Sequence, residues 1–203
     1  EVLGEIITQH GAVCFDGNGY SAEWHAEAEK RGLPNIKNTV DCLPVILEKE
    51  TTALFAKYGV YSEGELKSRF VILSENYVKT VNVEGRLTSF MGRTQILPAA
   101  LRYQGEVATA VNASKAAGVD NAAQLDLLKS LTATISDFQK ALGRLDHELG
   151  HHADGDVLSH AKHFRDKVLP AMSEVRKYGD KLETVVADDL WPLPTYREML
   201  FIK

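Results

Sequence analysis

The sequence has very little cysteine: Cys14 and Cys42 are the only two among its 203 residues. Two thiols are too few for a disulfide framework or a four-thiolate zinc site, so the fold must be held together in other ways. Each cysteine stands beside apolar neighbours, and we expect both to be buried thiols.

Long apolar runs and an excess of positive charge are also missing. No stretch approaches the roughly 18 uninterrupted apolar residues of a membrane span, and no basic segment leads into an apolar run at the N-terminus. The 23 Lys and Arg are outnumbered by 28 Asp and Glu, which gives a formal net charge of -5. The basic residues are scattered among acids, so no basic stripe indicates nucleic-acid binding. These absences predict a soluble, cytoplasmic protein with no nucleic-acid or membrane partner.

What the sequence does have is helical periodicity. Its 44% apolar content is enough for one substantial core or two small ones. The cleanest pattern is an apolar seam that alternates steps of three and four residues without a miss. Its members are Leu128, Leu131, Ile135, Phe138, Leu142, Leu145 and Leu149. A helix with such a seam needs partner helices to cover it.

A second long helix is predicted upstream of this seam. Ser62 and Glu65 have the spacing of a capping box, and the helix that they open should run to Tyr103. Pro98 should kink it, and Gly105 should divide it from a short helical piece. Its apolar stripe comprises Leu66, Phe70, Leu73, Tyr77, Val81, Leu87, Met91, Thr94, Leu97 and Leu101.

A third long helix should begin after Asp156 and kink at Pro170. The stretches around the two prolines are similar, Gln-Ile-Leu-Pro-Ala-Ala around Pro98 and Lys-Val-Leu-Pro-Ala-Met around Pro170. One short match supports a duplicated helical unit only weakly. Matched kinks in two packed helices explain the similarity better.

The first part of the chain has shorter segments. Val13 to Phe15 could form a short strand before a Gly-Asn-Gly turn. Because the first residue is Glu1 and a helix is already under way there, we expect that the chain was cut from something longer. Short helices are expected over residues 1–10, after Ser21, after Asp41 and from about Thr52 to Tyr58.

Together these segments predict an all-α fold: a long-helix antiparallel bundle with short helices and a loop segment at its N-terminal end. Residues 1–61 should hold the short helices and loops, and residues 62–203 should form the bundle.

One motif indicates a different function. His147-Glu148-Leu149-Gly150-His151 matches H-E-x-x-H, in which two imidazoles one helical turn apart bind zinc and the glutamate activates water. Glu174 could be a distant third ligand. A zinc-dependent metallopeptidase is therefore one alternative, and a free-standing helical interaction protein is another.

Three observations weigh against the zinc site. His147 and His151 lie off the leucine seam and should face solvent. The positions that the extended motif gives to glycine and a third histidine are Asp154 and Val157. No edge strand is predicted that could hold a peptide substrate. A solvated helix end, where histidines suit the helix dipole, is the favoured interpretation.

Several blocks of sequence, in order, resemble type III glutamine synthetases in the region that follows the catalytic core. They are FDGNGYSAEW (15–24), EAEKRGLPN (27–35), TVDCLP (39–44) and the closing LWPLPTYREMLF (190–201). The resemblance covers nearly the whole chain and is weakest from about Gly105 to His163, where the histidines lie.

The resemblance implies the C-terminal helical domain of an ATP-dependent ligase that joins ammonia to glutamate through a γ-glutamyl phosphate, with Mg²⁺ or Mn²⁺ clamping the phosphates. The family's metal, glutamate and nucleotide sites lie upstream, so no catalytic, cofactor-binding or metal-binding residue is assigned to this sequence. It also implies a large double-ring oligomer, and it makes residues 1–61 the tail of, or the connection to, the catalytic domain. We therefore expect an inactive structural domain whose partners are the upstream catalytic domain and further copies of the enzyme.

Overall fold

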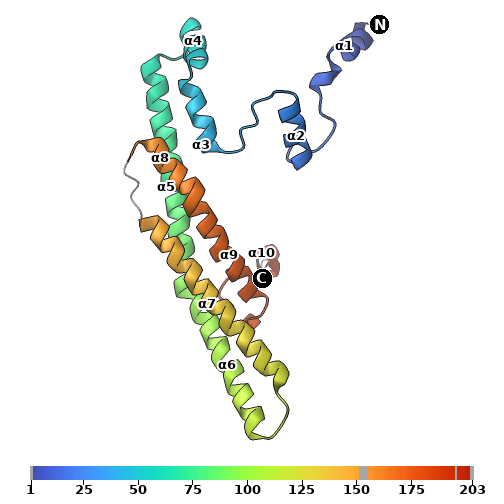
Figure 1. The fold of residues 1–203 in the computed structure, drawn as a ribbon, viewed down its shortest axis with the longest axis vertical. Coiled ribbons are helices and arrows are strands. Elements are labelled where there is room, and N and C mark those ends of the chain that lie inside the picture. The colour runs from blue at the N-terminus through green and yellow to red at the C-terminus, as the bar shows by residue number, and fades with distance from the viewer. Residues whose placement is uncertain (1, 151–154, 195, 202–203) are drawn as a thin grey trace.

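A computed structural model describes residues 2–150, 155–194 and 196–201 of the chain. Within these ranges every regular element is helical and no strand occurs. Three long helical rods lie side by side, while the first helices reach away from them (Figure 1). The predicted all-α class is confirmed. None of the described helices combines the length and the apolar content needed to cross a bilayer.

The first rod runs from α5 (Glu63–Met91) through a π-helical turn, η3 (Gly92–Ile96), into α6 (Leu97–Ala116). Its capping box is present: the Glu65 N–H donates to Ser62 Oγ over 3.3 Å, and the Ser62 N–H donates to the Glu65 carboxylate over 2.7 Å. The predicted kink at Pro98 takes the form of the π turn, because proline lacks an N–H and its ring displaces the carbonyl four residues back.

Gly105 does not divide this rod, so the predicted end near Tyr103 is wrong. A glycine inside a helix costs only about 1 kcal/mol relative to alanine. The buried side chains Val107 and Val111 hold the following turns of α6 against the bundle. Tertiary packing therefore outweighs the local preference, and the helix continues to Ala116.

The other two rods are α7 (Ala122–Gly150) and the series α8 (Val157–His163), η4 (Phe164–Val168) and α9 (Leu169–Glu183). Asp156 caps α8 as predicted, its carboxylate accepting from the Ser159 N–H over 2.8 Å. The second π turn, η4, ends two residues before Pro170, as η3 does before Pro98. The similar stretches thus give the same distortion in two rods.

The core follows the predicted seam of α7. Phe138, Leu142 and Leu145 are fully buried, and Leu128, at the end of the seam, is partly buried. Gly92 on the first rod makes room for this packing, since a Cβ there would lie 2.7 Å from Leu142 Cδ2. Side chains of α7 fill notches that the first rod leaves open.

The N-terminal part consists of α1 (Val2–His10), η1 (Gly11–Val13), α2 (Ala22–Lys30), α3 (Thr39–Cys42), η2 (Leu43–Leu47) and α4 (Lys49–Lys57). The strand proposed at Val13–Phe15 is wrong: no described segment offers a partner strand, and the chain there forms a short 3-10 turn instead. The short elements η5 (Asp188–Leu190) and α10 (Tyr196–Leu200) close the described chain.

Two local expectations in this part are also corrected. Asn38 caps α3, its side-chain oxygen accepting from the Asp41 N–H over 2.9 Å, so Asp41 lies inside the helix. Cys14 and Cys42 are both exposed, not buried. The α3–η2 segment packs through Val40 and Leu43, which turns Cys42 toward solvent.

Candidate functional site

The histidine motif lies at the end of α7. His147 is exposed on the last turns of the helix, as its position off the leucine seam predicted. His151, with His152 and Asp154, lies outside the described residues. Glu148 belongs to a contact with α8: its carbonyl accepts a hydrogen bond from His163 Nε2 over 3.0 Å, and its carboxylate lies 3.8 Å from the same nitrogen.

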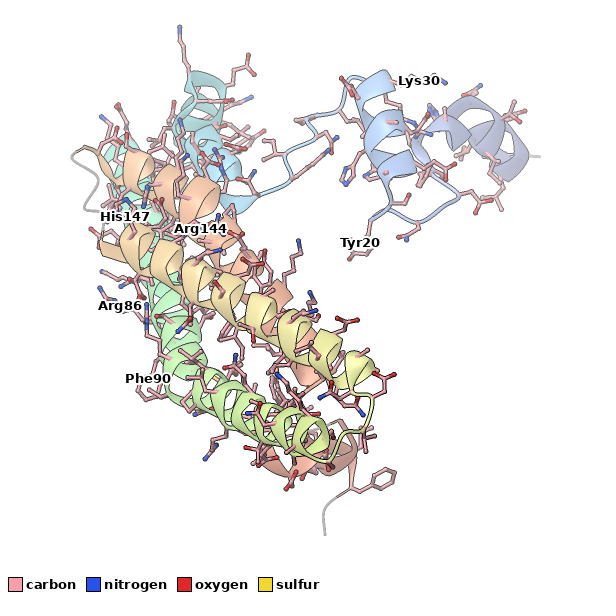
Figure 2. All side chains as sticks on the ribbon, turned by 60° about the horizontal axis from the view of Figure 1, so that its bottom comes forward. Tyr20, Lys30, Arg86, Phe90, Arg144 and His147 are labelled. Carbon is pink, nitrogen blue, oxygen red and sulfur yellow. The ribbon has the colours of Figure 1, made fainter. Side chains whose placement is uncertain are left out.

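Glu174, the third residue of the zinc interpretation, has a different neighbour. It lies on α9 and forms an ion pair with Arg144 of α7. Arg144 and His147 are one turn apart on α7 (Figure 2). Within the described ranges, no group of three or more His, Cys, Asp and Glu side chains is placed to hold a metal ion. The Glu174 carboxylate therefore serves as a link between two helices.

A second charged cluster fixes α3 to the third rod. The Arg165 guanidinium donates to Asp41 of α3 and to both carboxylate oxygens of Asp166, at 2.6 and 3.0 Å. The Asn38 amide and then Arg165 hold the pKa of Asp41 below its ordinary value. The Arg165 hydrogen bonds also lower the pKa of Asp166, while the two carboxylates raise the pKa of the guanidinium. All of these shifts favour the charged forms and so stabilise the cross-link.

A third cluster joins the first rod to α7. Asp146 accepts from the Ser89 hydroxyl and from Arg93, whose Nε lies 2.9 Å from the carboxylate. Ser89 is buried between the helices, so its hydroxyl needs such a partner. In this cluster, as in the other two, the charged groups pair with one another; Ser89 and Asp146 also line an open pocket together with Arg86 and Phe90. The arrangement suits cross-linking of helices better than acid–base chemistry.

The outer side of α5 is apolar as well as the inner side. Val83, Leu87 and Phe90 are between 53% and 65% exposed. At 3.6 residues per turn they lie opposite the buried positions Val81 and Gly85. Figure 2 shows Arg86 and Phe90 on this outer side. Leu87 was assigned to the core stripe from the sequence, and its exposure corrects that assignment.

Two of these features were missed from the sequence. The Asp41–Arg165 contact joins residues 124 positions apart, and no local pattern signals it. The outer stripe of α5 does have a signal, the spacing of four and three residues from Val83 to Leu87 and Phe90. This spacing does not stand out in the sequence, because α5 has apolar residues on two faces and the two patterns overlap.

The fold and its charged clusters define a class of protein: an all-α bundle of long helices, in which the described charged clusters link one helix to another. Comparison with known proteins gives the particular family. The family model for the glutamine synthetase C-terminal domain matches residues 1–115. The chain belongs to the glutamine synthetase family, as its C-terminal domain.

Individual relatives agree with this assignment along the chain. A glutamine synthetase of Butyrivibrio fibrisolvens is 36% identical over 205 residues, covering 99% of this chain. The type-3 glutamine synthetase of Dictyostelium discoideum is 30% identical, and a glutamine synthetase of Bacteroides fragilis is 29% identical, each covering 100% of the chain. The chain spans 29% of the length of each of these relatives. The resemblance inferred from the sequence is confirmed.

Proposed function

We propose that this chain is a structural domain of a larger glutamine synthetase, and that the parent enzyme condenses glutamate with ammonia at the expense of ATP, in the cytoplasm. The observation that carries the proposal is a relationship along the whole chain to glutamine synthetases of which it spans 29%. ATP and Mg²⁺ or Mn²⁺ would bind to the rest of the parent chain, where the phosphate-clamping groups would lie.

Within this role, residues 1–61 would connect the catalytic part to the bundle formed by residues 62–203. The connection is anchored at one end. Val40 is fully buried in the core, and Asp41 is held by Arg165. Force or motion in the connecting segment would thus be transmitted to the third rod, which suits a domain that braces another part of the enzyme.

The direct test is glutamine formation. With glutamate, ammonia, ATP and Mg²⁺ supplied, the chain alone should form glutamine at less than about a thousandth of the rate of the full-length parent, because it lacks the groups that stabilise phosphoryl transfer. The measurement is ATP-dependent glutamine release at equal molar concentration. ATP-dependent activity of the chain alone at a rate near that of the parent would refute the structural role.

The proposal includes a homo-oligomeric parent, and the outer stripe of α5 supports it. A long helix that is apolar on opposite faces is typical of one packed on both sides. Among the described residues the inner side, with Val81 and Gly85, is covered, and the outer side is exposed. A second copy of the enzyme is the partner that we assign to Val83, Leu87 and Phe90.

Replacing Phe90 with glutamate should therefore shift the full-length parent toward smaller assemblies, because a carboxylate would have to be desolvated in the contact. Mass photometry at nanomolar concentration would record the change as a fall of at least about tenfold in the fraction of the largest species. Gln139→Glu places the same charge on an exposed position of α7 and should leave the distribution unchanged. Identical distributions for wild type and Phe90→Glu would remove α5 from the interface.

A further inference from the structure

The first helix, α1, has an apolar face that no part of the described bundle covers. Val2, Leu3, Ile6 and Ile7 occupy one side of the helix, and Gly4, Glu5, Thr8 and Gln9 occupy the other. The four apolar side chains are between 49% and 75% exposed, and no residue of α1 is buried. Among the described residues the core cluster begins only at Val40.

A helix in this situation lacks a source of stability. α1 has nine residues, and isolated helices shorter than roughly 12–15 residues are marginal in water. Most helices of this length are stabilised by burial of an apolar face. Figure 1 shows α1 and α2 reaching away from the bundle, so the bundle does not provide that burial. The apolar face of α1 therefore needs a surface from outside the described residues.

The segment that carries α1 is organised, not loose. Arg31, just after α2, donates to the carbonyls of Ala12 and Cys14 at 2.8 and 3.5 Å and to the Glu27 carboxylate at 2.6 Å. Its guanidinium lies over the Trp24 ring, which is also 4.7 Å from the ring of Phe15. These contacts hold the loop after α1 against α2. They therefore fix the orientation of α1 relative to α2.

We infer that the apolar face of α1 is the docking surface by which residues 1–37 join the catalytic part of the same parent chain. This inference rests on the proposed function, because it requires a parent chain with a further domain. The length outside this structure is sufficient: the chain accounts for 29% of its relatives, which leaves most of each protein to supply the receiving surface.

Charge indicates the chemistry of that surface. Residues 1–37 contain six Asp and Glu against three Lys and Arg, a formal balance of -3. A receiving surface should therefore have an apolar groove for Leu3, Ile6 and Ile7, rimmed by basic side chains.

Hydrogen exchange of the peptide covering residues 2–10 tests the inference in the full-length parent. Docking should slow its exchange by at least about 100-fold relative to the chain alone. Ile6→Asp in the parent should return exchange to within about tenfold of the rate in the chain alone, since it places a charge in the apolar contact. Thr8→Asp is the matched control, because it adds the same charge on the polar face, and it should keep the protection.

Three results would overturn the inference. The first is equal exchange of residues 2–10 in the parent and in the chain alone. The second is an equal loss of protection from Ile6→Asp and Thr8→Asp. The third is protection that grows with the concentration of the chain alone, which would assign the surface to a second copy. Glutamine formation by the same parent separates the two proposals: a parent without this activity but with a protected α1 contradicts only the proposed function.

Discussion

Replacing Phe138 with alanine is expected to lower the free energy of unfolding by about 3–5 kcal/mol. The Phe138 side chain is fully buried at the middle of α7. Its ring lies 3.3 Å from the position that a Cβ would take on Gly92, and 3.9 Å from that position on Gly179. Two of its neighbours are thus glycines, which have no side chain that could move into the space left behind. The cavity should remain open, and its cost should lie toward the upper end of the range.

Thermal unfolding would show this loss as a fall in Tm of roughly 10 °C for a domain of this size. Leu127→Ala is the control on the same helix. Leu127 is 38% exposed and lies off the seam, so its truncation should cost less than about 1 kcal/mol. Similar losses for the two variants would mean that the seam of α7 is not the centre of the core.

The contrast between α7 and α5 explains why one long helix could be assigned to the core from its sequence and the other could not. Every residue of the α7 seam is large and apolar, so its periodicity has one interpretation. The inner face of α5 includes Ser74, Gly85 and Ser89, which are buried. At Gly85 the reason is space for α7, since a Cβ there would lie 2.9 Å from Leu149 Cδ2. A sequence pattern that counts only large apolar residues therefore passes over the inner face and includes exposed Leu87.

Short segments were harder to predict for a related reason. The α3 helix could begin after Asn38 or after Asp41, since both side chains are good N-caps. In the structure Asn38 is the cap, and the Asp41 side chain instead pairs with Arg165 from a distant part of the chain. Likewise, the exposure of Cys14 and Cys42 depends on which neighbouring side chains are buried in the core. That is a property of the tertiary structure.

The candidate site shows the limits of a motif. The helical setting of His147 and Glu148 could be predicted, because it is local. The interaction of Glu174 with Arg144, and of Glu148 with His163, depends on how α7, α8 and α9 are stacked. The blocks of family resemblance do not depend on how the helices are packed. They rest on residue identity at many positions, so they could be read from the sequence alone.

The last prediction concerns the cross-link between α3 and the third rod. Asp41 and Asp166 have pKa values below their ordinary ones, the former through Asn38 and Arg165 and the latter through Arg165. A carboxylate whose pKa is lower in the folded state contributes stability that is fully present above its unfolded pKa, near 4, and is lost as the pH falls through the folded value. The cross-link should thus be intact at pH 7 and weaken below about pH 4.

Exchange of residues 39–47, corrected for the intrinsic pH dependence of amide exchange, is expected to accelerate by roughly tenfold or more between pH 5 and pH 3. Exchange in the middle of α7 should change less, because Phe138 and Leu142 are buried by apolar contacts that do not titrate.

Arg165→Met should show fast exchange of residues 39–47 already at pH 7, with a smaller further response to acid, since the partner that lowers both carboxylate pKa values is gone. Lys79→Met removes an exposed pair with Glu75 and should behave as wild type. If Arg165→Met kept the wild-type pH profile, Val40 and Leu43 alone would hold α3 and η2 on the bundle, and the charged cross-link would add nothing to that contact.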